Sequence, residues 1–176
     1  SPVGKYSLEP RGDSLDPNYT PVYVGGLLTV TKAPLAVLAQ NAVKTYGQGN
    51  PAFSPASVVG LVNGDAEASL GYWAKTTATV FSPAGTYSLV PTIANPNYEP
   101  SFQSGILEIL PAPLTIMAKD ATRGYGQSNP AFEVKVSGLV GVDTIASIKG
   151  LGATTVATNL SPIGTYSIVP KGTNSN

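Results

Sequence analysis

The stretch TYGQGNPAF, residues 45–53, returns almost unchanged as GYGQSNPAF at residues 124–132. In each copy a glycine, which tolerates a positive φ, follows the tyrosine, and an Asn-Pro pair favours a turn. The tyrosine and the closing phenylalanine flank this turn as candidate core anchors, and we expect both to be at least half-buried. The stretch therefore predicts a structural turn that every unit of the chain needs, with a ligand-binding loop as the alternative. The residues given this structural role are Tyr46, Gly47, Phe53, Tyr125, Gly126 and Phe132.

Further blocks recur outward from this stretch at a spacing of roughly 80 residues. APL begins at Ala33 and Ala112, and GLV begins at Gly60 and Gly138. The pattern SPxGxYSxxP occurs three times, at residues 1–10, 82–91 and 161–170. This period is longer than the 20–50 residues typical of solenoids and propellers, so each unit is expected to have a core of its own.

The recurrence predicts that the chain is a piece of a longer tandem array. Residues 1–32 are expected to be the C-terminal part of one repeat, 33–111 a complete repeat, and 112–176 a repeat lacking its last strand. We refer to them as the first, second and third repeats.

Apolar and polar residues alternate along several segments, as half-buried strands require. Leu114, Ile116 and Ala118 share one face of LTIMAK, and residues 76–81, 86–90, 105–110 and 132–137 are also predicted strands. Asp65 and Asp143 precede short apolar runs and are predicted to cap one helical turn in each unit. The predicted fold is mostly β, with small β-grasp-like or β-sandwich-like units of about 80 residues and one short helical turn each.

Composition narrows the possible functions. Ten basic and ten acidic residues give a net charge of zero, which argues against a nucleic-acid or anionic-membrane surface. The chain has no Cys and no His, so thiolate chemistry, the commonest general base and the commonest metal ligand are missing. No apolar run approaches the roughly 18 residues of a membrane span. We therefore expect no catalytic site, no metal, no cofactor and no membrane insertion by this segment.

Taken together, the blocks AxxxxxxYGQxNPAF, GLVxGD and SPxGTYSxxP resemble the MBG repeat family of large bacterial adhesins, in its Tyr-Gly type. The resemblance covers essentially the whole chain. It implies a mostly-β, β-grasp-like module repeated in tandem within long secreted or surface-anchored proteins, without a catalytic site. The third repeat departs from the pattern at Val142, where the second repeat has Gly64, and this difference affects the expected turn.

Two places in the chain are candidate binding sites. Arg11, Gly12 and Asp13 form an RGD tripeptide in a loop longer than its counterpart, although these are also ordinary turn residues. Tyr72 and the single tryptophan, Trp73, are absent from the third repeat and form a candidate aromatic contact patch, with local packing as the alternative.

The sequence thus predicts a non-enzymatic stalk segment of a bacterial cell-surface or secreted adhesin-like protein. Its expected partners are the neighbouring repeats of the same chain. A module that binds a surface glycan or a host protein is one alternative. Another is a fibre subunit that associates head to tail when residues 18–30 of one copy complete the edge of the third repeat in the next.

Overall fold

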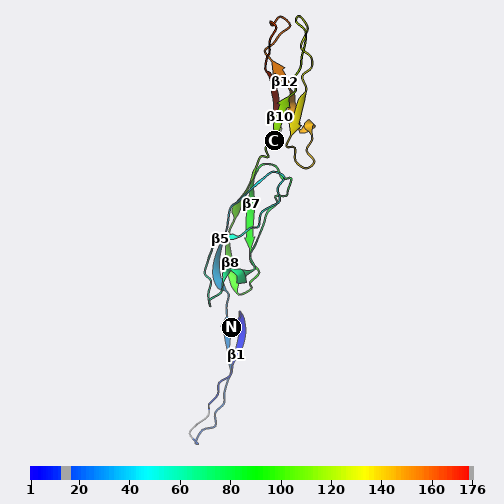
Figure 1. The fold of residues 1–176 in the computed structure, drawn as a ribbon. Coiled ribbons are helices and arrows are strands. Elements are labelled where there is room, and N and C mark those ends of the chain that lie inside the picture. The colour runs from blue at the N-terminus through cyan, green and yellow to red at the C-terminus, as the bar shows by residue number, and fades with distance from the viewer. Residues whose placement is uncertain (13–16, 175–176) are drawn as a thin grey trace. The chain divides into compact units, whose positions relative to one another are not determined.

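The computed structural model describes residues 1–12 and 17–174. The predicted mostly-β fold is confirmed: strands dominate, and the helical content within these ranges is two short 3-10 helices, η1 (Glu67–Leu70) and η2 (Ile145–Ser147) (Figure 1). The strands are β1 (Gly4–Leu8), β2 (Gly26–Val30), β3 (Ala33–Ala39), β4 (Ala42–Thr45), β5 (Pro55–Val59), β6 (Trp73–Lys75), β7 (Gly85–Thr92), β8 (Tyr98–Gln103), β9 (Gly105–Leu110), β10 (Thr115–Ala118), β11 (Val134–Ser137), β12 (Ile148–Thr155) and β13 (Ile168–Asn174).

Contacts along the backbone divide the chain into two compact units. Unit 1 contains Ser1–Ala42, Ala52–Thr77 and Ser88–Leu107, and unit 2 contains Val43–Pro51, Ala78–Tyr87 and Glu108–Asn176. Residues of the second repeat are distributed over both units, so this division follows packing and not sequence recurrence. The repeat boundaries stay a prediction.

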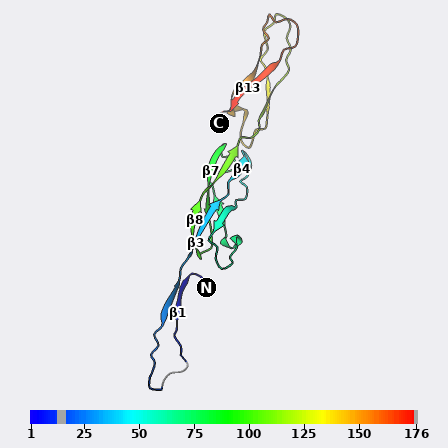
Figure 2. The ribbon, with the colours of Figure 1, turned by 90° about the vertical axis from the view of Figure 1, so that its left-hand side faces the viewer.

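Unit 1 is built around β3, the central strand of a three-stranded sheet in the order β5-β3-β8. β3 pairs antiparallel with β5 and parallel with β8, and Figure 2 shows β3 beside β8. Alternate residues of β3, Leu35, Val37 and Ala39, are buried, because successive side chains of a strand point to opposite faces. Leu35 and Val37 join Leu70 and Tyr98 in the core cluster of this unit.

A four-stranded sheet has the order β4-β9-β7-β6. β9 alternates between buried and exposed residues along its whole length, with Leu107 and Ile109 on the buried face. This agrees with the strand predicted from GILEIL. β7 buries Leu89 in the same way. β1 and β2 form a separate antiparallel pair.

Unit 2 contains two antiparallel pairs, β10 with β11 and β12 with β13. Ile116 and Val136 lie opposite each other on the half-buried faces of the first pair. In the second pair a Cβ added to Gly172 would lie 3.1 Å from Ile148 and 3.3 Å from Ile116, so the missing side chain leaves room for these two residues. Among the large side chains that the structure describes in the third repeat, that of Ile148 is the most buried.

One predicted strand is wrong. Residues 76–81 form a bend and a turn, and β6 ends before them at Lys75. The Thr- and Val-rich composition of residues 76–81 favours a strand. Their backbone groups, however, are hydrogen-bonded to side chains. The carbonyl of Ala78 accepts from Asn50, the carbonyl of Thr79 accepts from Lys44, and the amide of Thr79 donates to Ser82. Those groups are therefore not available to a strand ladder.

The predicted helix caps are also wrong. Short 3-10 helices do follow Asp65 and Asp143, but each starts one residue later than capping requires. The cap positions are Ala66 and Thr144, and neither makes a side-chain capping hydrogen bond. The two carboxylates are instead bound by tyrosine hydroxyl groups, as described below.

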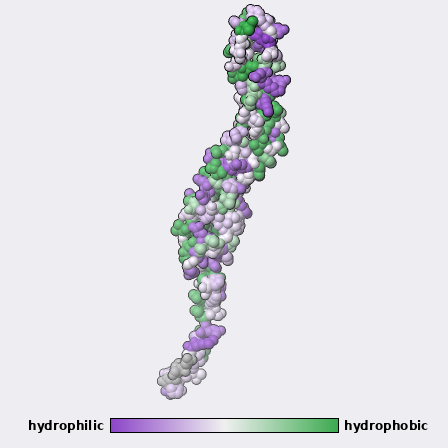
Figure 3. Space-filling view, viewed as in Figure 1, coloured by the Kyte–Doolittle hydropathy of each residue, from purple (hydrophilic) through white to green (hydrophobic). Residues whose placement is uncertain are grey.

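Hydrophilic and hydrophobic residues are intermixed on the face drawn in Figure 3. Within residues 1–12 and 17–174 we find no helix with the length and apolar character that crossing a membrane demands.

Candidate functional site

The repeated stretch forms the same turn in both copies, which we call the Tyr-Gly corner (residues 44–53 and 123–132). Gly47 and Gly126 adopt positive φ values of 86° and 82°. In the first copy Gln48 closes the turn, since its amide donates to the carbonyl of Thr45 and its Oε1 accepts from the amide of Thr45 at 3.0 Å. Gln127 makes the equivalent pair of hydrogen bonds with Gly124.

Each corner is also attached to a second loop. The Asn50 side chain donates to the carbonyl of Ala78 at 2.8 Å, and Asn129 donates to Ala157 over the same distance. A cation supplements this contact in both copies. Lys44, which is buried, donates to the carbonyls of Gln48 and Thr79, and Arg123 donates to the carbonyl of Thr158.

These anchoring residues were not predicted from the sequence. Gln48 and Asn50 recur as Gln127 and Asn129, so recurrence was a signal that could have found them. Lys44 was harder to find, because its counterpart is Arg123 and the shared feature is only the positive charge.

The SPxGxYS block has one fixed contact in all three copies. The tyrosine hydroxyl donates to the carbonyl of the proline four residues earlier, at 2.7–3.0 Å. The pairs are Tyr6 with Pro2, Tyr87 with Pro83, and Tyr166 with Pro162. This contact explains why the tyrosine recurs.

The GLVxxD blocks form two further loops, residues 60–65 and 138–143, which we call the aspartate loops. Their first glycines, Gly60 and Gly138, have φ values of 110° and 100°. Each loop is closed by a hydrogen bond from the aspartate amide to the carbonyl of the valine three residues earlier. At the two positions before the aspartate, Asn63 and Gly64 both have positive φ in the first loop, whereas in the second loop Gly141 has positive φ and Val142, which replaces the second glycine, does not.

A tyrosine hydroxyl binds the aspartate of each loop. Tyr98 donates to Oδ2 of Asp65 at 2.6 Å and accepts from the amide of Val62 at 3.2 Å, so the first loop is fixed within its own repeat. In the second loop the partner of Asp143 is Tyr46, which belongs to the preceding repeat. The hydrogen bond to Asp143, followed by burial and the carboxylate charge, raises the pKa of Tyr46 above its ordinary value.

Two close approaches within unit 2 accompany this hydrogen bond. A Cβ added to Gly47 would overlap the side chain of Val140, and a Cβ added to Gly141 would overlap the ring of Phe81. The first corner is thus in direct contact with the second aspartate loop, and both contacts need a residue without a side chain. Tyr46, Gly47 and Asp143, predicted as purely local structural residues, here connect one repeat to the next.

The second corner has a different environment. Tyr125 is 68% exposed, so the expectation that it is at least half-buried is wrong. A Cβ added to Gly126 would meet no atom within 4 Å. Tyr46 is partly buried and bonds to Asp143 of the second aspartate loop, whereas Tyr125 is exposed. Phe53 and Phe132 are both partly buried.

The candidate aromatic patch is divided between two faces. Trp73 lies on the edge strand β6 and is 41% exposed. Tyr72 packs against the core cluster of unit 1, and burial raises its pKa. Neighbouring residues in an extended chain point in opposite directions, so Trp73 alone is available as a contact surface.

The RGD tripeptide lies partly outside the described residues. Asp13 belongs to the part that is not described. Arg11 is exposed and lies 3.7 Å from Glu9, while the carbonyl of Gly12 accepts a hydrogen bond from Tyr23.

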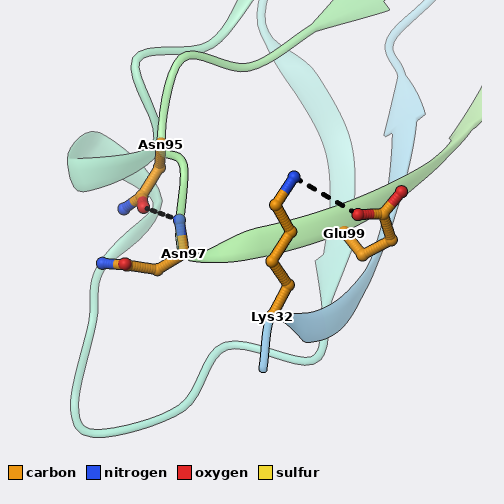
Figure 4. Close-up of polar contacts among 4 residues, drawn as sticks. All are labelled: Lys32, Asn95, Asn97 and Glu99. Carbon is orange, nitrogen blue, oxygen red and sulfur yellow. Dashed lines mark hydrogen bonds and ion pairs between the residues drawn. The ribbon is translucent and has the colours of Figure 1, made fainter. Parts of the chain in front are cut away.

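Contacts between the first and second repeats lie within unit 1 (Figure 4). Lys32 points toward Glu99 and forms an ion pair of 3.4 Å with it. The side chain of Asn97 accepts from the amide of Val3 in the first repeat, and its carbonyl accepts from Ala33, the first residue of the second repeat. A turn in which the amide of Asn97 donates to Asn95 holds these acceptors in place. Both neighbours of the second repeat therefore contact it through specific polar groups.

Corner, aspartate loop and SPxGxYS contact recur as a set, which defines a tandem β-repeat protein. A family model described as MBG domain (YGX type) matches residues 35–108 and 114–176. The chain belongs to this family, and the resemblance inferred from the sequence is confirmed. Searches of curated proteins and of solved structures found no match.

The contact between Tyr46 and Asp143 predicts a coupled titration. In Asp143→Asn the carboxylate charge is lost, so the pKa of Tyr46 should fall toward its ordinary value of about 10. The pKa of Tyr46 is higher in the folded chain than in the unfolded chain. The contribution of this contact to the free energy of unfolding is therefore complete below the unfolded-state pKa, and it is lost as the pH rises through the folded-state pKa. NMR titration of selectively labelled tyrosines would measure the change.

Two controls accompany this titration. The Tyr125 signal should not respond to Asp143→Asn, and Asp65→Asn should lower the pKa of Tyr98 and leave that of Tyr46 unchanged. An unaltered Tyr46 pKa in Asp143→Asn would contradict the contact.

Proposed function

We propose that the chain is a non-enzymatic structural segment, a stalk, of a bacterial cell-surface or secreted adhesin-like repeat protein. The observation that carries this proposal is the contact of the first Tyr-Gly corner with the second aspartate loop. The residues that define the family are used there to join consecutive repeats, which is the requirement for a load-bearing array.

The absence of an assembled site among the described residues supports a non-enzymatic role. In residues 1–12 and 17–174 no group of three His, Cys, Asp or Glu side chains is placed to hold a metal ion. The polar groups that recur in the repeats, such as Lys44, Asn50 and Asp65, are bound to other parts of the fold. Catalysis needs a nucleophile or base that remains accessible to substrate.

Composition fits an extracellular location. The charged residues amount to 11% and the net charge is zero, so the surface attracts neither polyanions nor polycations. The chain has no Cys, and its folding therefore does not depend on the redox state of its surroundings. Pro111 and Pro113 restrict the backbone between the second and third repeats.

A spacer test separates a stalk from a binding module. The chain is inserted between a lectin head of known specificity and a surface anchor, and a Gly/Ser linker of equal length serves as the control. A stalk should improve capture of ligand through a surface polysaccharide layer relative to the flexible linker, because its folded repeats resist collapse. The affinity of the detached head for its sugar should stay the same.

Binding of the full chain to an array of glycans and host proteins tests the alternative, a binding module. Specific binding that Trp73→Ala abolishes would favour the binding module, since Trp73 is the exposed aromatic residue of β6. Equal capture by the Gly/Ser linker would also count against the stalk.

A further inference from the structure

The indole of Trp73 lies at a position that the fold does not need to fill. β6 and β12 each place an alanine opposite the last proline of an SPxGxYSxxP block, and the residues before these alanines are Trp73 and Gly152. The two positions are therefore equivalent in the second and third repeats. A Cβ added to Gly152 would meet only Cε of Lys171, at 3.7 Å, apart from its chain neighbours. The position thus accepts a side chain but does not require one.

This position is open in both repeats. Trp73 belongs to the repeat whose predicted strands are all present, and its side chain is 41% exposed. Gly152 belongs to the repeat that follows, and within unit 2 no residue of the second repeat would lie within 4 Å of a Cβ at Gly152. The exposure of Trp73 is therefore a property of the repeat itself.

Trp73 has a polar and a positively charged neighbour on the same face of the sheet. Successive side chains of a strand point to opposite faces, so Trp73 and Lys75 share one face of β6. Their cross-strand partners on β7 are Thr92 and Val90, respectively. Opposite residues of such a pair lie about 5 Å apart, and residues two apart on one strand lie about 7 Å apart. These four side chains therefore fall within the reach of one small ligand.

The charge on this face is positive and unpaired. Lys75 is the only charged residue of β6 and β7, and it is exposed. It forms no ion pair with any residue in the part of the chain that the structure describes. A ligand that carries one negative charge beside an apolar ring surface complements this arrangement.

We propose that Trp73, Lys75 and Thr92 form a binding site for a single carboxylated sugar residue, a uronic or a sialic acid. The C–H face of the sugar ring stacks on the indole, whose face is electron-rich. The sugar carboxylate accepts a hydrogen bond from the ammonium group of Lys75, and the hydroxyl of Thr92 binds a sugar hydroxyl. β6 is an edge strand, so the rest of a saccharide chain can extend past it.

Local contacts determine the expected affinity. The net charge of zero supplies no long-range attraction for an anion. An open surface with one aromatic ring binds weakly, with a dissociation constant on the order of 1–10 mM. An exposed ion pair adds a factor of about 2–5 in affinity, so the acidic sugar should be preferred over its neutral analogue by about that factor.

The single tryptophan allows a direct test, because the full chain gives one indole N–H signal in an NMR spectrum. Methyl glucuronide is the acidic probe, and methyl glucoside, which has a hydroxymethyl group in place of the carboxylate, is its matched neutral control. The indole signal and the amide signals of Lys75 and Thr92 should shift and saturate with both sugars, at about 2–5-fold lower concentration for the glucuronide. A methyl sialoside in parallel distinguishes a terminal sialic acid from a uronic acid as the preferred ligand.

Two variants separate stacking from charge pairing. Trp73→Ala should abolish the shifts at Thr92 for every sugar. Lys75→Gln should lower the affinity for the glucuronide to that for the glucoside and leave glucoside binding unchanged. Both side chains are exposed, so the fold should tolerate the changes. Lys171→Gln is the control: it removes an exposed cation beside Gly152, where no aromatic ring is present, and should leave binding unchanged.

Three outcomes would overturn the proposal. The first is the absence of any shift up to about 50 mM of each sugar, well above the expected dissociation constants. The others are equal affinities for glucuronide and glucoside, and a preference for the acidic sugar that survives Lys75→Gln.

This inference goes beyond the stalk function and does not depend on it. A contact of millimolar affinity does not survive the washing of an array, so it is compatible with a segment that serves as a spacer. A chain that improves capture in the spacer test but shows no response to the sugars would retain the proposed function and lose this inference.

Discussion

Leu70→Ala is expected to lower the free energy of unfolding of unit 1 by about 2–5 kcal/mol. Leu70 is fully buried at the end of η1 and packs in one cluster with Leu35, Val37 and Tyr98. Truncation removes three carbon atoms from the core and leaves a cavity that the two neighbouring strands cannot close. The carbonyl of Leu70 also accepts from the amides of Ala94 and Asn95, so its backbone is held in place and cannot move into the space.

Denaturant unfolding of the full chain would measure this effect. Trp73 is the single tryptophan and lies in unit 1, so its fluorescence reports on the unit that is changed. Leu160→Ala makes the same chemical change at a position that is 76% exposed and should alter stability by less than about 0.5 kcal/mol. Equal midpoints for both variants would show that the cluster around Leu70 is not the core of unit 1.

The second large effect is expected at the first glycine of each aspartate loop. A Cβ added to Gly60 would lie 2.5 Å from the carbonyl oxygen of Pro34, and one added to Gly138 would lie 2.5 Å from that of Pro113. These oxygens belong to the backbone and cannot rotate away. A φ near 100° costs a residue with a side chain roughly 1–3 kcal/mol in addition. We therefore expect Gly60→Ala and Gly138→Ala each to cost more than about 3 kcal/mol.

Gly64→Ala separates the cost of the positive φ from the cost of overlap with a backbone oxygen. Gly64 also has a positive φ, of 78°, but a Cβ there would meet no atom within 4 Å. It should cost only the backbone contribution of about 1–2 kcal/mol. Urea unfolding followed by circular dichroism would compare the three variants. If Gly60→Ala were no more destabilising than Gly64→Ala, the close approach of the GLV glycine to the APL proline would be refuted.

The sequence predicted well what depends on local pattern. The alternation in GILEIL determines which face of β9 is buried, because a period of two follows from strand geometry alone. The turn at Gly47 and Gly126 was also predictable, because the conformational preferences of glycine and asparagine are local properties of the sequence. The family was recognisable because its blocks occur at fixed spacing.

Features that depend on distant partners were not predictable. Residues 76–81 have strand propensity, but Asn50 and Lys44, some 30 residues earlier, bind their carbonyls. Asp65 was assigned to a local cap because nothing in its neighbourhood indicates Tyr98, 33 residues away. Tyr46 and Tyr125 occupy the same motif, and only the loop that lies against one of them distinguishes their exposure.

Many of the recurring polar side chains have a backbone carbonyl as their partner. Asn50, Lys44 and the three tyrosines of the SPxGxYS blocks all donate to such oxygens. Every residue type carries this acceptor, so the accepting positions are free to mutate without loss of the hydrogen bond. Copies of the repeat can therefore diverge in sequence while each keeps its fold. Divergence of this kind protects an array, since adjacent repeats that differ are less prone to exchange elements during folding.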